Sequence, residues 1–123
     1  MRTAEVNKVK VEENLGWVAL REIYKLVGSE DGAKVVRILV EHGETKSSTL
    51  MATSGIASAK FYNLIKALEL CQVVERTVHK DRTVSYKISP FGENVLRLSE
   101  PIIKEIQQEF KDKESTLLEA VQK

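Results

Sequence analysis

The chain has 123 residues, a length that suits one domain around a single hydrophobic core. Hydrophobic residues make up 42% and charged residues 30%, with a net charge of +1, so any binding to nucleic acid must come from local charge. One cysteine excludes an internal disulfide, two histidines exclude an ordinary Cys/His metal cluster, and no apolar run approaches the roughly 20 residues of a membrane span. We therefore expect a soluble cytoplasmic protein without a metal or another cofactor.

Two helices are predicted in the first third of the chain. Apolar residues recur near one face over residues 12–27, and Gly28 is a plausible helix stop. Ser29 can cap a second helix that runs to about His42, where Gly43 closes it.

A short helix, a glycine turn and a longer helix follow. Residues 45–48 offer several N-cap candidates ahead of a helix of about two turns that ends at Gly55. Gly55 allows a sharp change of direction because glycine tolerates positive φ, and Ile56 is expected to plug the core. The next helix is predicted over residues 58–70.

From Val73 onwards the sequence becomes rich in β-branched residues. Residues 73–89 read as a two-stranded hairpin whose turn is His79-Lys80-Asp81-Arg82. Pro90 ends the second strand, and a long helical pattern continues to the C-terminus. Pro101 lies inside that pattern and predicts a kink, or a restart capped by Ser99.

This order of elements is that of a winged helix-turn-helix, a mainly α fold with a β-hairpin wing (α+β). In such a fold one helix braces the DNA backbone, the next enters the major groove, and the hairpin reaches an adjacent groove or phosphate. We expect a single domain over residues 1–123, with a DNA-binding core at 29–90 and a long C-terminal dimerisation helix at 91–123, to which helix 12–27 can add.

The helix at 58–70 divides into two faces at 100° per residue. The apolar face holds Phe61, Leu64, Ile65 and Leu68. The other face suits DNA, because asparagine can bond adenine, lysine can reach guanine or phosphate, and a small residue permits close approach. The residues predicted to contact DNA are Ser47, Ser58, Ala59, Lys60, Tyr62, Asn63, Lys66, Arg76, His79, Lys80 and Arg82.

Charge is segregated along the sequence. Residues 56–90 hold six basic and three acidic residues, a net +3, whereas residues 91–123 hold five basic and seven acidic residues, a net −2. The positive part coincides with the predicted DNA-binding elements.

Residues 47–96 resemble the DNA-binding part of MarR/ArsR-type winged-helix regulators. The resemblance rests on Gly55-Ile56, Leu68-Glu69, Asp81-Arg82 and the helix start Ser89-Pro90-Phe91-Gly92. The small size and the long closing helix make the whole chain most similar to the small crenarchaeal leucine-responsive-regulator-like family. The resemblance implies an archaeal homodimer that binds double-stranded DNA and regulates transcription. Cys71 departs from the pattern, because many MarR-type proteins have a glycine there.

The tail independently suggests a dimer. An apolar stripe at three-, four- and seven-residue intervals predicts a coiled-coil interface formed by Ile102, Ile103, Ile106, Phe110, Leu117, Leu118 and Val121. The alternative is that this stripe folds back on its own domain.

Other interpretations remain open at this stage. The same residues suit a low-specificity, chromatin-like architectural DNA-binding protein, and some winged helices serve protein contact instead. No paired carboxylates, nucleophile with a base, phosphate loop or metal pattern indicates an enzyme. Cys71 is expected to be a buried structural thiol rather than a redox sensor, because its sequence neighbours are uncharged.

Overall fold

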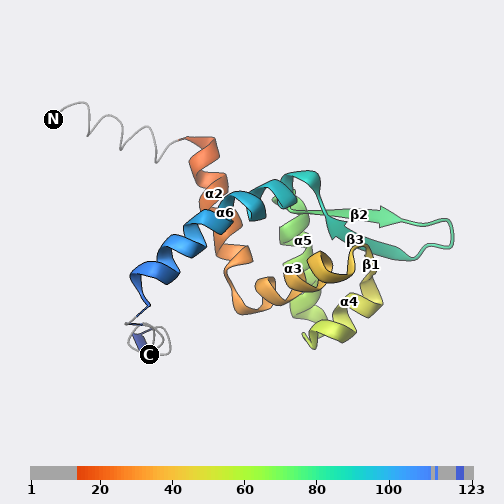
Figure 1. The fold of residues 1–123 in the computed structure, drawn as a ribbon. Helices are drawn as coiled ribbons and strands as arrows, with labels where there is room; N and C mark the ends of the chain where they lie inside the picture. The colour runs from red at the N-terminus through yellow and green to blue at the C-terminus, as the bar shows by residue number, and fades with distance from the viewer. Residues whose placement is uncertain (1–13, 112, 114–118, 121–123) are drawn as a thin grey trace. The chain divides into compact units, whose positions relative to one another are not determined.

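The computed structural model describes residues 14–111, 113 and 119–120 (Figure 1). Its contacts separate two compact units, one ending at Gly92 and one beginning at Glu93. Within the described residues there are five longer helices and three strands, mainly α with a β wing as the sequence predicts. No described helix is long and apolar enough to cross a membrane.

The first two described helices end at the predicted glycines, Gly28 and Gly43, and the second has the predicted cap, whereas the cap of the first was not predicted. Helix α2 spans Leu15–Val27, and the Asn14 side chain accepts a hydrogen bond from the Trp17 amide at 3.3 Å. Helix α3 spans Glu30–His42, and the Ser29 hydroxyl accepts from the Gly32 amide at 3.1 Å. A hydroxyl or amide oxygen at this position satisfies an N–H group that has no partner within the helix.

The glycine turn and the helix that follows it also form as predicted. Helix α4 spans Ser47–Ser54, and Gly55 ends it in the left-handed conformation with φ of 70°. Ile56 is buried directly after this turn, and helix α5 then spans Ser58–Leu70. The turn therefore sets α5 at an angle to α4, as a helix-turn-helix requires.

The sheet has three strands rather than the two of the predicted hairpin. Strand β1 (Thr45–Lys46) pairs antiparallel with β3 (Val84–Ile88), which pairs antiparallel with β2 (Val74–Val78), so the order is β1-β3-β2. The expected side-chain cap of α4 is wrong, because Lys46 occupies the N-cap position and no side chain bonds there. Residues 45–46 form a strand because they pair with β3, which is distant in the sequence. The local sequence pattern around them does not indicate this pairing.

The core of the first unit lies between α2, α3, α4, α5 and the inner face of the sheet. From α5, Phe61, Ile65 and Leu68 are buried, and Leu64 is half-buried, which confirms the predicted apolar face. The other large buried side chains are Ile23, Val35, Val36, Leu39, Leu50, Val73, Val74, Tyr86 and Ile88.

The last helix of the fold begins at a tightly packed corner. The Ser89 hydroxyl accepts from the Gly92 amide at 2.8 Å and donates to the Gln72 carbonyl at 2.5 Å, which caps helix α6 (Pro90–Glu109). A Cβ on Gly92 would lie 2.3 Å from the Val73 carbonyl oxygen. Glycine is therefore required at position 92 for close approach, in agreement with the predicted helix start.

At the end of α5, Cys71 neither has the backbone conformation that favours glycine nor is buried as expected. The left-handed residue is Gln72, with φ of 63°, while Cys71 has an ordinary φ of −81°. The Cys71 side chain is partly exposed rather than buried, because it stands at the C-cap of α5 and not on its apolar face.

Helix α6 is shorter and more continuous than the sequence suggested. It runs through Pro101 without a restart, and the Ser99 hydroxyl donates to the Val95 carbonyl at 2.7 Å, as a mid-helix serine does, instead of capping a new helix. It ends at Glu109, and Phe110 lies in a turn beyond it. The predicted interface residues Leu117, Leu118 and Val121 lie outside the described residues.

Candidate nucleic-acid interface

The polar face of α5 is open to solvent and carries the residues expected there. We call the exposed residues Ser58, Ala59, Lys60, Tyr62, Asn63 and Lys66 the recognition face. Tyr62 is 52% exposed, and its ring meets the buried Phe61 ring edge to face with centroids 5.5 Å apart. This packing fixes the base of the tyrosine while its outer part faces solvent.

An open hollow of about 460 Å³ lies beside the recognition face. It is bounded by the start of α4, by Tyr62 of α5 and by strands β2 and β3. Its lining consists of Lys46, Ser47, Ser48, Tyr62, Arg76, Thr83, Val84 and Tyr86. The lining thus combines two cations with five hydroxyl groups and includes no carboxylate, a composition that suits an anion.

The first turn of α4 reinforces this preference. The helix begins at Ser47 with no side-chain cap, so its first N–H groups are not occupied by a capping side chain. The amino end of a helix carries a partial positive charge and attracts phosphate groups. Lys46, Ser47 and Ser48 therefore bring a side-chain cation, two hydroxyls and backbone donors to one edge of the hollow.

Arg76 and Tyr86 lie opposite each other on β2 and β3 and form the sheet side of the hollow. Burial raises the pKa of the Tyr86 hydroxyl, and the Glu69 carboxylate acts in the same direction, whereas Arg76 opposes both. The phenol therefore keeps its proton at neutral pH and remains a hydrogen-bond donor behind the hollow.

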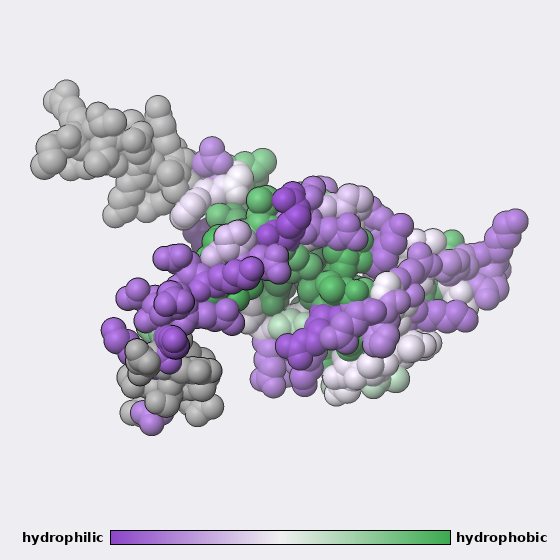
Figure 2. Space-filling model, viewed as in Figure 1, coloured by the Kyte–Doolittle hydropathy of each residue, from purple (hydrophilic) through white to green (hydrophobic). Residues whose placement is uncertain are grey.

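The wing, which we define as β2, β3 and the turn between them, projects beyond the helices (Figure 1) and is hydrophilic at its far end (Figure 2). The Arg82 amide donates to the His79 carbonyl at 2.9 Å, and Arg82 itself is left-handed with φ of 71°. The hairpin connection thus has three residues, Lys80 to Arg82, with the last one left-handed, which is a common arrangement. Lys80 and Arg82 are exposed in it, as predicted.

Asp81 shapes the same turn from within. The Thr83 hydroxyl and the Thr83 amide both donate to Asp81 Oδ1, at 2.6 and 3.1 Å. These bonds hold the pKa of the Asp81 carboxyl below its ordinary value, with a smaller contribution from Lys46. Because the pKa is lowered, the stabilisation of the turn is complete at neutral pH and is lost only as the pH falls below about 4.

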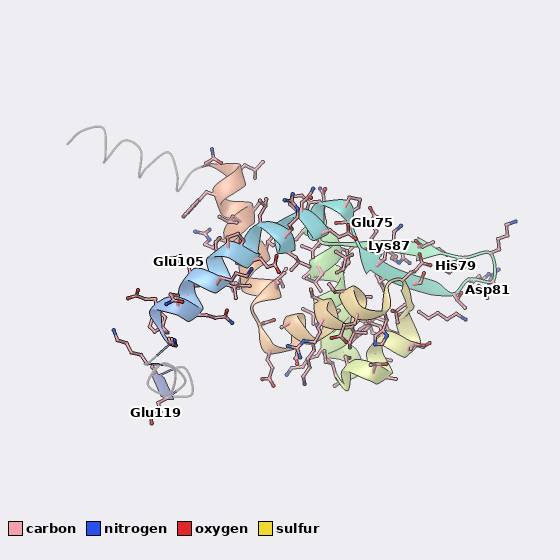
Figure 3. All side chains as sticks on the ribbon, viewed as in Figure 1. Glu75, His79, Asp81, Lys87, Glu105 and Glu119 are labelled. Carbon is pink, nitrogen blue, oxygen red and sulfur yellow. The ribbon has the colours of Figure 1, made fainter. Side chains whose placement is uncertain are left out.

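His79 is directed away from the hollow. Successive side chains of a strand point to opposite faces, so Ser85 and Tyr86 lie on opposite sides of β3. The His79 Nε2 atom lies 2.8 Å from the Ser85 hydroxyl, on the face opposite Tyr86 and the hollow. The same outer face carries an ion pair of 3.7 Å between Lys87 and Glu75 nearer the base of the wing (Figure 3).

The structure thus brings together some of the predicted residues and separates others. Ser47, Tyr62 and Arg76 share the hollow, and the remaining α5 residues extend from it along the recognition face. Sequence reasoning missed Lys46 and Ser48, which border the hollow because β1 draws residues 45–46 against the sheet. The sequence signal that could have indicated them is a lysine followed by two serines at a predicted helix start, Lys46-Ser47-Ser48. Among the described residues, no group of His, Cys, Asp and Glu side chains could hold a metal ion.

No protein-family model and no curated protein matches this sequence. Solved structures match its fold. The homodimeric winged helix-turn-helix DNA-binding domain of Mb0332 from Mycobacterium bovis has a TM-score of 0.60 at 17% identity, over 76% of this chain and 83% of its own. Transcriptional regulator PA4135 gives 0.56 at 21% identity over 96% and 92% of the two chains. The ArsR family transcriptional regulator RHA00566 gives 0.56 at 17% identity over 73% and 91%.

These similarities confirm the predicted winged helix-turn-helix fold, with structural neighbours among ArsR-family regulators. At such low identities they establish the fold and not the activity. The MarR-type and crenarchaeal resemblances remain predictions from the sequence.

Proposed function

We propose that this protein is a homodimeric transcription regulator that binds double-stranded DNA through the recognition face of α5 and through the wing. The observation that carries this proposal is the hollow, because it joins a carboxylate-free cationic lining to the recognition face. A duplex offers the matching pattern, since its phosphates run beside the groove in which the bases are exposed.

In the proposed complex α5 lies in the major groove. Asn63 is placed to bond an adenine in a bidentate manner, and Lys66 to reach a guanine or a phosphate. Ala59 leaves room for close approach to the base edges. These three positions are exposed on one side of a helix whose other side is anchored in the core, so the side that meets DNA is fixed.

The hollow receives the DNA backbone beside that groove. Arg76 approaches a phosphate from the sheet, and Lys46 with the first turn of α4 approaches from the helix side. Lys80 and Arg82 extend the contact outward along the wing. Most protein–DNA hydrogen bonds go to phosphates and position the protein without reading sequence, which is the role assigned to these residues.

Homodimer formation is the second part of the proposal. Ile102, Ile103 and Ile106 are 52%, 51% and 48% exposed and lie within five residues of each other on α6. Exposed apolar residues that lie together mark interaction sites, whereas single ones do not. Two copies joined through this stripe would present two α5 helices to successive major grooves, about 34 Å apart. The similarity to the homodimeric domain of Mb0332 is in keeping with such an arrangement.

The test separates base reading from phosphate binding. We select a preferred duplex from a random-sequence pool and measure affinity by fluorescence anisotropy over a range of salt concentrations. Asn63→Ala is expected to reduce the preference for the selected sequence over random DNA, by the about 1–3 kcal/mol of a bidentate contact. Lys66→Ala is expected to weaken binding to all sequences and to lower the salt slope by about one.

Lys104→Ala is the matched control, because it removes the same charge from α6, outside the proposed surface. Affinity and sequence preference should be unchanged in this variant. Equal affinities for wild type, Asn63→Ala and Lys66→Ala would contradict the proposal. Binding without any sequence preference, but with the predicted effect of Lys66→Ala, would instead indicate an architectural DNA-binding protein.

A further inference from the structure

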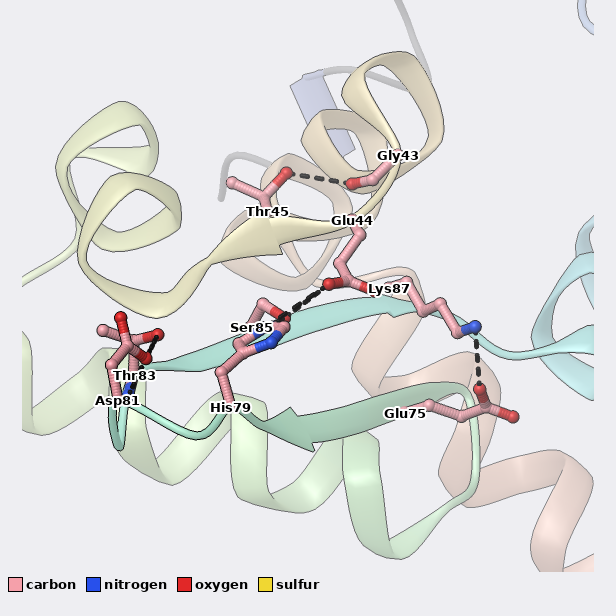
Figure 4. Close-up of polar contacts among 9 residues, drawn as sticks. All are labelled: Gly43, Glu44, Thr45, Glu75, His79, Asp81, Thr83, Ser85 and Lys87. Atoms are coloured by element: carbon pink, nitrogen blue, oxygen red, sulfur yellow. Dashed lines mark hydrogen bonds and ion pairs between the residues drawn. The ribbon is translucent and has the colours of Figure 1, made fainter.

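Three side chains tie the three strands together on the outer face of the sheet (Figure 4). The Ser85 hydroxyl on β3 donates to Glu44 Oε2 at 2.8 Å, and Nε2 of His79, the residue after β2, lies 2.8 Å from the same hydroxyl. His79 Nε2 also lies 3.5 Å from Glu44 Oε2. Ser85 is 2% exposed, whereas the side chains of His79 and Glu44 are 40% and 42% exposed.

The protons of this cluster can be assigned. Ser85 has one hydroxyl hydrogen, and Glu44 receives it. The contact between Ser85 and His79 therefore requires the imidazole to donate from Nε2, which leaves the hydroxyl oxygen as acceptor. His79 is then not a base for Ser85, so the cluster is a structural tie and not a nucleophile with its activating group.

The tie acts on the position of the wing. Glu44 directly precedes β1, which joins α3 to α4, and His79 is the first residue of the wing turn, whose amide donates to the Thr83 carbonyl at 2.8 Å. Strand β2 is one of the two edge strands and is held by β3 alone among the described strands. The contact to Glu44 consequently links the start of the wing turn to the segment that leads into the edge of the hollow.

The charged neighbours of His79 leave Glu44 as its ion-pair partner. On the same face, Glu75 and Lys87 pair with each other at 3.7 Å. In the turn, Asp81 is occupied by Thr83. The other ionisable side chains nearby in the chain are Lys46 on β1, Lys80 and Arg82 in the turn, and Glu41 and His42 at the end of α3. Among the described residues, Glu44 is the carboxylate that forms an ion pair with His79. Helix α4 contributes no ionisable side chain.

We infer that Glu44 and His79 are positioning residues that hold the wing against β1, and that protonation of His79 strengthens this hold and raises affinity for DNA. The inference rests on the proposed function. Histidine changes charge between about pH 5 and 8, and only its protonated form adds an ion pair to the hydrogen bond. His79 then acts through the wing and does not itself contact DNA.

The expected size of the effect follows from the exposure of the pair. Ion pairs near the surface are weak and are screened by salt. Lowering the pH from 8 to 6 should therefore raise affinity for a duplex by about two- to fivefold at low salt, and by less as salt increases.

The experiment compares wild type with Glu44→Gln at several pH values, both in the full-length chain. Glutamine keeps an acceptor for the Ser85 hydroxyl and removes only the charge, so the fold is expected to persist. In wild type, amide signals of Val78 and Thr83 should shift in NMR spectra together with the His79 ring signal, without DNA present. In Glu44→Gln this coupled shift and the pH-dependent gain in affinity should both disappear.

Glu75→Gln is the control, because it removes a carboxylate of similar exposure from the same sheet face without touching His79. It should behave as wild type. If Glu44→Gln keeps the pH-dependent gain, the contact between His79 and Glu44 is not its source and the inference is wrong. Loss of the gain in both variants would also contradict it, because a general field and not one contact would then be responsible.

The NMR measurement without DNA distinguishes a failure of the inference on Glu44 and His79 from a failure of the proposed function. In one outcome the wing signals follow His79 in wild type and not in Glu44→Gln, and the protein binds no duplex at any pH. That outcome would support the tie and refute DNA binding. Duplex binding whose pH dependence persists in Glu44→Gln would refute the tie and leave the proposed function standing.

Discussion

Arg82 combines an unfavourable backbone conformation with a charge at the outer end of the wing. Its φ of 71° lies in the left-handed region, which costs a non-glycine residue about 1–2 kcal/mol. Asparagine tolerates this region better than most residues do. Arg82 therefore places a long cation at a backbone position that favours glycine or asparagine, and in the proposed complex this cation contacts a phosphate.

Two substitutions of Arg82 separate the charge from the backbone. Arg82→Ala and Arg82→Asn both remove the guanidinium, so both should weaken duplex binding and lower its salt slope by about one. Arg82→Asn should be the more stable of the two by up to about 1 kcal/mol in chemical denaturation, because asparagine suits the positive φ. Equal salt slopes in wild type and in both variants would show that Arg82 does not bind phosphate.

At the scale of the elements, local sequence patterns predicted helix bounds and caps, which depend on neighbouring residues. The bounds of α5 follow from the glycine turn before it and from apolar residues at helical spacing, and Ser89 caps α6 in the manner expected of its sequence. Strand β1 was missed because it has two residues and exists only through pairing with Tyr86 and Ser85, some 40 positions away. The hollow could not be predicted for the same reason, since its lining comes from five separate elements and the wing turn.

The orientation of His79 could not be predicted for a similar reason. The turn sequence places it among cations, which suggests a shared contact with DNA. Strand register instead places the His79 side chain on the outer face, where it contacts Ser85, which in turn donates to Glu44. One residue of register decides between the two faces of a sheet, and the sequence pattern around His79 contains little to fix it.

Helix α6 is the element on which the proposed dimer depends. Ile106→Glu places a charge within the exposed apolar stripe, and a charge buried between two copies without a partner is strongly destabilising. We expect light scattering to show a monomer at protein concentrations where wild type is a dimer, with an unchanged circular dichroism spectrum.

Gln108→Glu is the control for that variant. It adds the same charge about 200° around the helix from Ile106, at an exposed polar position, and should remain a dimer. A well-folded Ile106→Glu dimer would show that the α6 stripe is not the interface.

At the scale of the whole molecule, the proposal unites features that come from distant parts of the sequence. Net positive charge gathers between residues 56 and 90, and net negative charge follows between residues 91 and 123. The fold of the first unit then aligns the cations at 46 and 76 with the recognition face. Composition alone, with its net charge of +1, would not have indicated a polyanionic partner.

The central claim is that the recognition face, the hollow and the wing form one DNA-binding surface. The most direct test is an amide NMR spectrum of the full chain, titrated with a selected duplex at low salt. The account predicts that shifts concentrate at residues 46–48, at exposed positions of α5 and at residues 80–82 of the wing. No shifts, or shifts confined to α6, would contradict it.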